Sequence, residues 1–511
     1  MKTLISKKMK ITTLSILIFV LSYGINAQTI VETQDGKIQG YSSNGIDIYK
    51  GIPFAQPPTG ALRWKAPQPV IPWEDVKECI EFGPSPIQNK PEPFLCWSEE
   101  FIAKPEPLSE DCLYLNVWTP AKRKTEKLPV FVWIYGGGLS SGSANCDIYD
   151  GQQMAEQGII YVSINYRVGV LGFMAHPELS KESGHNASGN YGFMDQLQAL
   201  KWVKNNIEAF GGDPGNVTIA GQSAGSFSVN AQIASPLAKG YFQKAITQSG
   251  GILSGRLMQD LPSAEQQGAS FAKLANAGSI AELRKIPAEE LQKISHQSEV
   301  GRFGVVSDAY FLPTDLLHYF KEGKQNQVSV LSGWVTGDAS LFPVNDITTA
   351  SFKKDAFQNY GDRTGEFLEY FPANTNEEAT ASQKKLNLLN FAGVPSYLLA
   401  KYMDKNVWLY EFTHVPTNKP GFPNYGAFHT SEVPFALHTL DQWNRDWKPE
   451  ERTLENQMSA YWVNFAKTGN PNGENLPVWN AYDIHNGNIM IFDTDLGMQE
   501  IYKKEFEFLT H

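Results

Sequence analysis

The clearest chemical signal in the sequence is a serine between two glycines, GQSAG at residues 221–225. A short β-branched and apolar run, Val217 to Ala220, comes directly before it and predicts a buried parallel strand. A strand, a G-x-S-x-G turn and a helix hold the serine in a strained backbone conformation with its hydroxyl exposed. Ser223 is therefore predicted to be a nucleophile, with the backbone N–H of Ala224 near the position of a developing oxyanion. The alternative is a chance glycine-serine turn, since the bare motif is common.

A second signal is the run of three glycines at residues 136–138, which follows the apolar segment Leu128 to Ile134. Glycines after a buried strand expose backbone N–H groups with no side chain in the way. A flexible loop is the simpler explanation. Upstream of a G-x-S-x-G turn, however, such a loop is typical of the second part of an oxyanion hole.

A serine nucleophile needs a base, and the base needs an acid that orients it. In parallel sheets these groups gather at the carboxyl ends of strands. Where the serine lies in a G-x-S-x-G turn between a strand and a helix, the acid comes next along the chain and the histidine follows the acid. Asp338 comes just after the strand predicted at 328–331, and His429 lies in a glycine-containing loop after the strand predicted at 407–412. Besides His429 and His438, five downstream histidines lie in helical patterns, in a polar turn, before a proline-rich loop or at the terminus: His296, His318, His485, His414 and His511.

The elements that must position these residues alternate between strands and helices. Besides the strands already named, apolar runs predict strands at 113–118, 159–164 and 245–248, and a hairpin at 31–40. Helical patterns cover 189–210, most of 255–325 and 350–404, and 450–467. A long segment at 84–109, rich in proline and aromatic residues, is predicted to be a functional surface loop. The pattern predicts an α/β protein with a central, mostly parallel sheet flanked by helices.

The chain has 511 residues, 42% of them hydrophobic and 19% charged, which is ordinary for a globular protein. No proline-, glycine- or serine-rich linker and no repeat divides it, so residues 28–511 are predicted to form one domain. The formal charge is −11, and −15 without the four lysines of residues 1–27. This acidity argues against nucleic acid or an anionic membrane as partner.

Residues 1–27 have the pattern of a secretory signal peptide. Four lysines precede the mainly apolar run Ile11 to Leu21, and Ala27 is a small residue suited to cleavage before Gln28. The apolar run is short for a transmembrane helix, and no other stretch is long enough. We therefore expect an exported protein, periplasmic or extracellular, without stable membrane insertion.

Four cysteines are present, at positions 79, 96, 112 and 146. Disulfides are permitted in an exported protein, and four cysteines allow three complete pairings. None of them forms a C-x-x-C pair, so neither metal binding nor redox chemistry is expected. No cofactor is expected either.

The sequence resembles the type-B carboxylesterase/lipase family of α/β-hydrolases, which includes the cholinesterases. The resemblance covers nearly all of residues 28–511 and rests on GIPFAQPPTGALRW, SEDCLYLNVW, WIYGGG, NYRVGVLGF, SGNYGFMDQ, FGGDPGNVTIAGQSAG and GAFHTSEVPF, in the family's order. It implies an α/β-hydrolase fold with helical insertions around the active site. It also implies Ser223 as nucleophile, His429 as base, Asp338 as acid, and an oxyanion hole of Gly137, Gly138 and Ala224. Two structural ion pairs are implied, Arg63 with Glu110 and Arg167 with Asp195.

The sequence departs from the family pattern at four places. Asp338 stands where the family usually has glutamate, so its loop must approach His429 more closely. Gln222 replaces a common glutamate beside the serine, which disfavours a cationic choline-type ester. Leu139 stands where an aromatic residue is common. The usual partner of Cys112 is missing, so either Cys79 or Cys96 is expected to pair with it.

These observations predict a secreted serine carboxylesterase that acts on a small-molecule ester through an acyl-enzyme intermediate. A lipase-like esterase is the first alternative, although no long apolar lid is evident in the sequence. The second is a binding protein of the same fold that has lost its triad. This chain keeps both Ser223 and His429, which disfavours that alternative.

Overall fold

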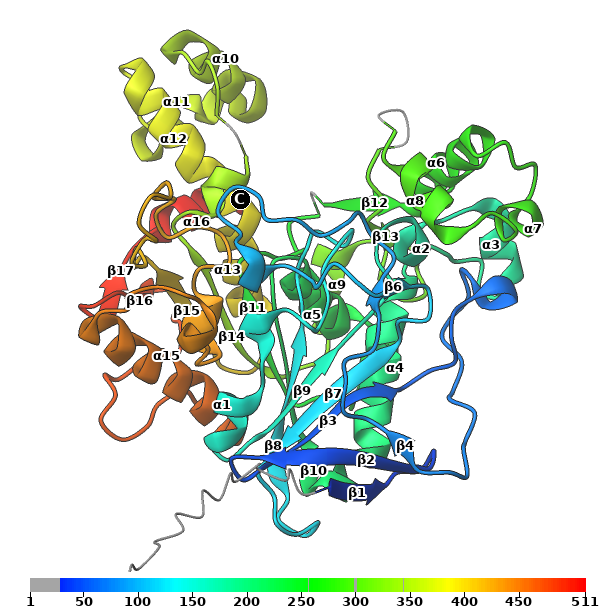
Figure 1. Cartoon of the computed structure of the whole chain (residues 1–511). Coiled ribbons are helices and arrows are strands. Elements are labelled where there is room, and N and C mark those ends of the chain that lie inside the picture. Colours follow the sequence, from blue (N-terminus) through cyan, green and yellow to red (C-terminus); the bar gives the residue numbers. More distant parts are fainter. Residues whose placement is uncertain (1–27, 256, 298–300, 343) are drawn as a thin grey trace, which may run out of the picture.

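The computed structural model describes residues 28–255, 257–297, 301–342 and 344–511 (Figure 1). The predicted signal peptide, residues 1–27, lies outside the described residues.

A 13-stranded sheet runs through the molecule. Its strands are β1 (Gln28–Glu32), β2 (Lys37–Ser43), β3 (Ile46–Pro53), β4 (Lys77–Glu78), β7 (Tyr114–Thr119), β8 (Leu128–Ile134), β9 (Ile160–Ile164), β10 (Gly212–Gln222), β11 (Lys244–Gln248), β14 (Ser329–Val335), β15 (Val407–Phe412), β16 (Asn488–Phe492) and β17 (Gly497–Glu500). Two short strand pairs lie apart from it: β5 (Ser85–Pro86) with β6 (Leu108–Ser109), and β12 (Met258–Asp260) with β13 (Val305–Ser307).

The strand order is β1-β2-β3-β7-β9-β8-β10-β11-β14-β15-β16-β17, with β4 beside β2. Within the block β9-β8-β10-β11-β14-β15-β16 all pairings are parallel. Antiparallel pairings flank this block on both sides. The carboxyl ends of β8, β10, β14 and β15 therefore open at one edge of the sheet. The predicted central, mostly parallel sheet is confirmed.

The helices are α1 (Gln152–Glu156), α2 (Gly169–Phe173), α3 (Pro177–Glu182), α4 (Tyr191–Asn206), α5 (Ala224–Ala234), α6 (Leu261–Leu274), α7 (Ile280–Leu283), α8 (Ala288–Ser295), α9 (Leu316–Lys321), α10 (Thr349–Tyr360), α11 (Thr364–Tyr370), α12 (Asn376–Leu388), α13 (Val394–Tyr402), α14 (Val433–Ala436), α15 (Pro449–Thr468) and α16 (Lys503–Leu509). Two helical insertions, α6–α8 and α10–α12, lie at the upper end of the molecule in Figure 1.

Burial explains why the central strands are continuously apolar. In β8 the side chains from Val130 to Ile134 are fully buried, because helices cover a parallel sheet on both faces. The predicted helix at 189–210 forms as α4 and continues as a 3-10 turn to Phe210. It ends at Gly211, whose φ of 84° is a left-handed conformation that glycine adopts at little cost.

Both ion pairs implied by the sequence form. Arg63 Nη2 lies 2.6 Å from Glu110 Oε2, and Arg63 Nη1 donates to the carbonyl oxygen of Ile286 at 2.7 Å. Arg167 Nη2 lies 2.7 Å from Asp195 Oδ1 in the interior. The first pair joins the segment after β3 to the segment before β7, and the hydrogen bond of Arg63 to Ile286 adds the segment between α7 and α8. The second pair joins α4 to the loop after β9.

The disulfide predicted for Cys112 is not present. All four cysteines lie in the described part of the chain, and each is a free thiol. The backbone of Cys79 is held beside β2, where its N–H donates to Gln39 O at 2.7 Å. Cys112 is buried just before β7, and burial raises the pKa of its thiol well above the usual value. The spacing of the cysteines along the chain therefore did not predict that Cys112 is unpaired.

Among the described residues, no helix is both long enough and apolar enough to cross a lipid bilayer.

Candidate active site

Ser223 occupies the turn between β10 and α5, in the strained conformation that its motif predicts. Its φ is 59° and its ψ is −122°, a combination that non-glycine residues rarely adopt. The two glycines of the motif are required by sterics. A Cβ atom at Gly221 would lie 2.6 Å from the backbone of Gly225, and one at Gly225 would overlap the carbonyl oxygen of Ile134. The Ser223 N–H donates to Gln248 O at 2.8 Å, which fixes the turn to β11.

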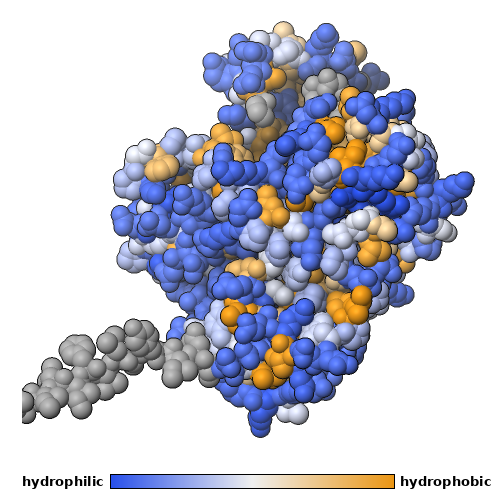
Figure 2. Space-filling model, turned by 45° about the vertical axis from the view of Figure 1, so that its right-hand side comes forward, coloured by the Kyte–Doolittle hydropathy of each residue, from blue (hydrophilic) through white to orange (hydrophobic). Residues whose placement is uncertain are grey.

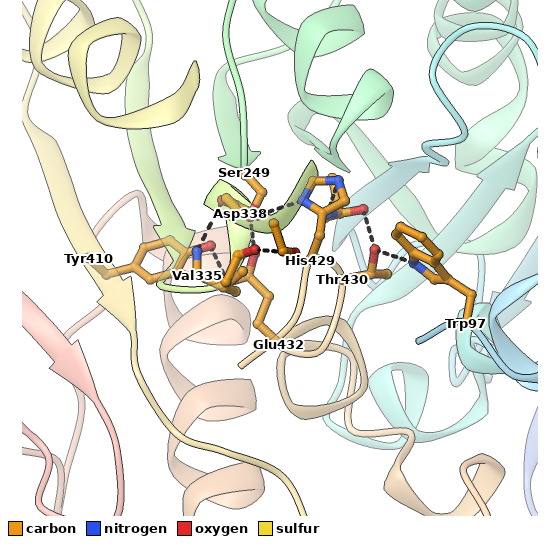
Figure 3. Close-up of polar contacts among 11 residues, drawn as sticks. Trp97, Ser249, Val335, Asp338, Tyr410, His429, Thr430 and Glu432 are labelled. Atoms are coloured by element: carbon orange, nitrogen blue, oxygen red, sulfur yellow. Dashed lines mark hydrogen bonds and ion pairs between the residues drawn. The ribbon is translucent and has the colours of Figure 1, made fainter. Parts of the chain in front are cut away.

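His429 and Asp338 are joined directly. His429 Nδ1 lies 2.5 Å from Asp338 Oδ1, and both side chains are buried (Figure 3). The second carboxyl oxygen, Oδ2, accepts from the Val335 N–H at 3.3 Å. Asp338 begins a 3-10 turn directly after β14, and His429 lies between β15 and α14. The structure thus brings together the acid and the base that the sequence predicted.

Backbone pairing of the two loops lets the short aspartate side chain reach the histidine. Gly337 forms an isolated bridge with Phe428, and its N–H donates to Ala427 O at 2.9 Å. A Cβ atom at residue 337 would overlap that carbonyl group, so a glycine is needed for the approach. In this arrangement the Asp338 carboxylate reaches His429 Nδ1 at 2.5 Å.

The other ring nitrogen of His429 faces Gln222. Gln222 Nε2 lies 3.2 Å from His429 Nε2, while its Oε1 accepts from the Thr430 hydroxyl at 3.3 Å. Trp97 Nε1 donates to Thr430 Oγ1 at 3.1 Å, so a chain of contacts runs from the aromatic loop to the histidine (Figure 3). Among the described residues, no hydrogen bond joins Ser223 Oγ to His429. Catalytic hydrogen bonds are often long until substrate is bound.

The glycine loop after β8 lies beside the serine turn. A Cβ atom at Gly136 would lie 3.0 Å from Ser223 Cβ, and Gly137 and Gly138 have φ of 113° and 65°. The N–H groups of Gly137 and Gly138 donate to no acceptor within the described ranges. Ala224 is the first residue of α5, where an N–H has no partner in its own helix. Three backbone donors are therefore available beside Ser223.

Two further buried carboxyl groups, Glu411 and Glu432, lie close enough to Asp338 to interact with its charge, and the sequence analysis did not identify them. Glu432 contacts the Ser249 hydroxyl at 3.3 Å and the Tyr410 hydroxyl at 2.7 Å (Figure 3). Burial raises the pKa of Glu432 to about 8, so this group is mostly protonated at pH 7. Burial also raises the pKa of Glu411 to about 7. The one sequence signal for Glu432 was its position three residues after His429.

A cavity of about 810 Å³ contains both Ser223 and His429. Its size is within the range of sites that bind drug-sized molecules. The segment at 84–109, predicted to be a functional surface loop, lines this cavity through Phe94, Trp97 and Phe101. Trp97 packs edge-on against the His429 ring with centroids 6.4 Å apart. On the face drawn in Figure 2, apolar residues form small separate groups among hydrophilic ones.

Within the part of the chain that the structure describes, no cluster of three or more His, Cys, Asp or Glu residues could hold a metal.

A parallel sheet with a strained serine turn, a histidine–aspartate pair and a glycine loop at its strand ends is the arrangement of an α/β-hydrolase. The chain belongs to the carboxylesterase family, whose sequence profile matches residues 27–509. It is a carboxylic ester hydrolase.

Individual relatives agree with this assignment. The chain is 36% identical to the para-nitrobenzyl esterase of Bacillus subtilis over 487 residues, which covers 92% of this chain and 96% of the relative. It is 34% identical to the fumonisin B1 esterase of Sphingopyxis macrogoltabida, covering 92% and 87% of the two chains. A solved structure of a PNB esterase superposes with a TM-score of 0.81 at 31% identity, covering 94% of this chain and 99% of that one.

Proposed function

We propose that this protein is an exported serine carboxylesterase with a Ser223–His429–Asp338 triad and an acyl-enzyme intermediate. The 2.5 Å contact of His429 Nδ1 with Asp338, in the same cavity as the strained Ser223, is the observation that carries the proposal. Gly137, Gly138 and Ala224 supply the N–H donors of the oxyanion hole.

In the proposed reaction, His429 Nε2 takes the proton of Ser223 as Oγ attacks the ester carbonyl carbon. Asp338 holds the proton on Nδ1 and stabilises the imidazolium. The three backbone N–H groups stabilise the oxyanion, and the alcohol leaves with the proton from His429. Water then cleaves the acyl-enzyme by the same steps. The Gln222 amide contacts Nε2 at 3.2 Å, so we infer that it releases this nitrogen when the ester enters.

The substrate side of the proposal rests on the cavity. Aromatic side chains and a volume of about 810 Å³ suit an ester with moderately sized apolar groups. Gln222 places no negative charge beside the serine, which disfavours choline-type esters. The names of the relatives, para-nitrobenzyl esterase and fumonisin B1 esterase, support an organic ester as the substrate.

Export and domain organisation belong to the same proposal. The basic and then apolar pattern of residues 1–27 supports cleavage near Ala27, and the one large sheet of 13 strands supports one domain at 28–511. N-terminal sequencing of protein recovered outside the cytoplasm should begin near Gln28. An intact Met1 on an exported and active enzyme would contradict the cleavage.

The mechanism is tested by covalent labelling. The wild-type enzyme should hydrolyse a panel of p-nitrophenyl esters of increasing acyl length, with an initial burst when deacylation is slow. A phosphonate ester should modify the peptide that contains Ser223. Ser223→Ala should fold normally, resist labelling and lose turnover by a factor on the order of a million. A folded Ser223→Ala enzyme with near-normal turnover would overturn the mechanism.

The same panel of p-nitrophenyl esters distinguishes an esterase from the lipase-like alternative. A true lipase should gain activity sharply when a long-chain ester forms an interface, whereas an esterase that binds single molecules should follow ordinary saturation.

A further inference from the structure

Arg302 is a cation in the wall of the active-site cavity that the proposed mechanism does not use. It lies three residues before β13, and it lines the same cavity as Ser223 and His429. Its Nη2 donates to the carbonyl oxygen of Gly138. The guanidinium is therefore anchored to the loop whose N–H groups are proposed to bind the oxyanion.

The close approach depends on the lack of a side chain at residue 138. A Cβ atom there would overlap the Arg302 guanidinium, and the φ of Gly138 is 65°. The glycine loop therefore lies close to Ser223 through Gly136 and close to Arg302 through Gly138.

The charge of Arg302 is not neutralised by the described residues. Across residues 28–255, 257–297, 301–342 and 344–511, no carboxylate lies within 4.0 Å of its guanidinium. The nearby cavity wall also contains His296, while Lys90 and Glu92 face each other at 3.4 Å. An arginine keeps its positive charge in proteins. The cavity thus holds a cation with no acidic partner in the described part of the protein.

Most of the donors on Arg302 are unused. A guanidinium has five N–H donors in a planar fork, and the Gly138 carbonyl is its one hydrogen-bond acceptor among the described residues. Arg302 is exposed to the cavity rather than packed inside the fold. Such a fork matches the two oxygens of a carboxylate.

We propose that Arg302 determines specificity by binding a carboxylate carried by the ester substrate while the ester group lies at Ser223. The inference rests on the proposed function and assigns its substrate class, anionic esters such as monoesters of dicarboxylic acids. Arg302 takes no part in bond making. It holds the far end of the substrate, and its contact with Gly138 links that binding to the oxyanion loop.

The test uses two pairs of esters, and the two members of each pair differ only by a carboxylate in place of a methyl group. In the acyl pair, mono-p-nitrophenyl glutarate is compared with p-nitrophenyl pentanoate. In the alcohol pair, 3-acetoxybenzoate is compared with 3-methylphenyl acetate. Arg302→Met keeps the side-chain length and removes the charge. It should lower kcat/KM for the anionic member of at least one pair by about 10- to 100-fold, mainly through KM, and change the neutral members by less than about threefold.

Two further variants sharpen the result. Arg302→Lys keeps the charge but not the fork, so it should restore part of the lost kcat/KM. Arg123→Met removes a cation from the exposed loop between β7 and β8, where the side chain is 80% exposed. It controls for the change in net charge and should leave the ratio of anionic to neutral kcat/KM unchanged.

Equal losses on both members of both pairs would overturn the proposal, because they would show that Arg302 only supports the Gly138 loop. An unchanged ratio in Arg302→Met would also overturn it. If the wild-type enzyme hydrolysed none of the four esters, the proposed esterase function itself would fail. Calorimetric binding of glutarate would then decide the role of Arg302, since equal affinities of wild type and Arg302→Met would exclude it.

Discussion

Gly337 and Ala427 are joined by a backbone hydrogen bond of 2.9 Å, and this contact sets the distance between the acid and the base of the site. Gly337 directly precedes Asp338 in one loop, and Ala427 is two residues before His429 in the other. With the two backbones tied together, an aspartate reaches the histidine at 2.5 Å. Four predictions follow from this arrangement and its surroundings.

Asp338→Glu should lower turnover by roughly 10- to 100-fold, because the added methylene must fit between two loops that are already in contact. Asp338→Asn should cost about ten-thousand-fold, since an amide favours the wrong tautomer of His429. Both are measured as kcat with a p-nitrophenyl ester. Wild-type turnover by Asp338→Glu would show that the loops adjust freely.

Gly337→Ala should destabilise the fold and reduce activity together. The new methyl group would overlap the carbonyl of Ala427, so the loops must separate, at a cost of about 2–4 kcal/mol in the free energy of unfolding. The matched control is Gly365→Ala in α11, where no atom lies within 4 Å of the new Cβ. That variant should be neutral or stabilise by about 0.5–1 kcal/mol. Chemical denaturation of both variants checks the difference, and equal stabilities would contradict the assigned role of Gly337.

Glu432 should make stability fall as pH rises from about 5 to 8. Its pKa is about 8 in the folded protein and 4.5 in the unfolded chain, so between these values the folded state binds an additional proton. The free energy of unfolding then decreases with pH through that window. Glu432→Gln resembles the protonated form and should lose less stability over the same range. Denaturant unfolding of both proteins at pH 5, 7 and 9 measures this, and parallel pH dependences would refute it.

Gln222→Glu should move the acidic limb of the kcat/KM profile to higher pH. The new carboxylate would lie where the amide now approaches His429 Nε2 at 3.2 Å, and it would stabilise the protonated ring. Gln222→Met, which lacks both charge and amide, is the control. The same Glu variant should improve hydrolysis of a choline ester relative to its neutral isostere. An unshifted profile would show that residue 222 does not act on the base.

Local patterns were sufficient to predict which residues the fold brings together at the candidate site. The turn at Ser223 follows from short-range sterics, because its parts are consecutive in the chain. These parts are β10, the two glycines Gly221 and Gly225, and the start of α5. Asp338 and His429 were found because parallel strands place their following loops at one edge. For the same reason the glycine run at 136–138 could be connected with Ser223. The Arg167–Asp195 pair followed from the family resemblance and forms as implied.

Only the tertiary structure decided which groups surround this framework and in what state. The free thiol of Cys112 depends on packing against segments that no spacing rule identifies. The raised pKa of Glu432 depends on complete burial, and the contact of Gln222 with His429 joins residues 207 positions apart. Arg302 reaches Gly138 across 164 positions. Sequence determines the short-range turns and strand ends, whereas burial and charge pairing arise from distant segments that meet only when the sheet and its insertions have folded.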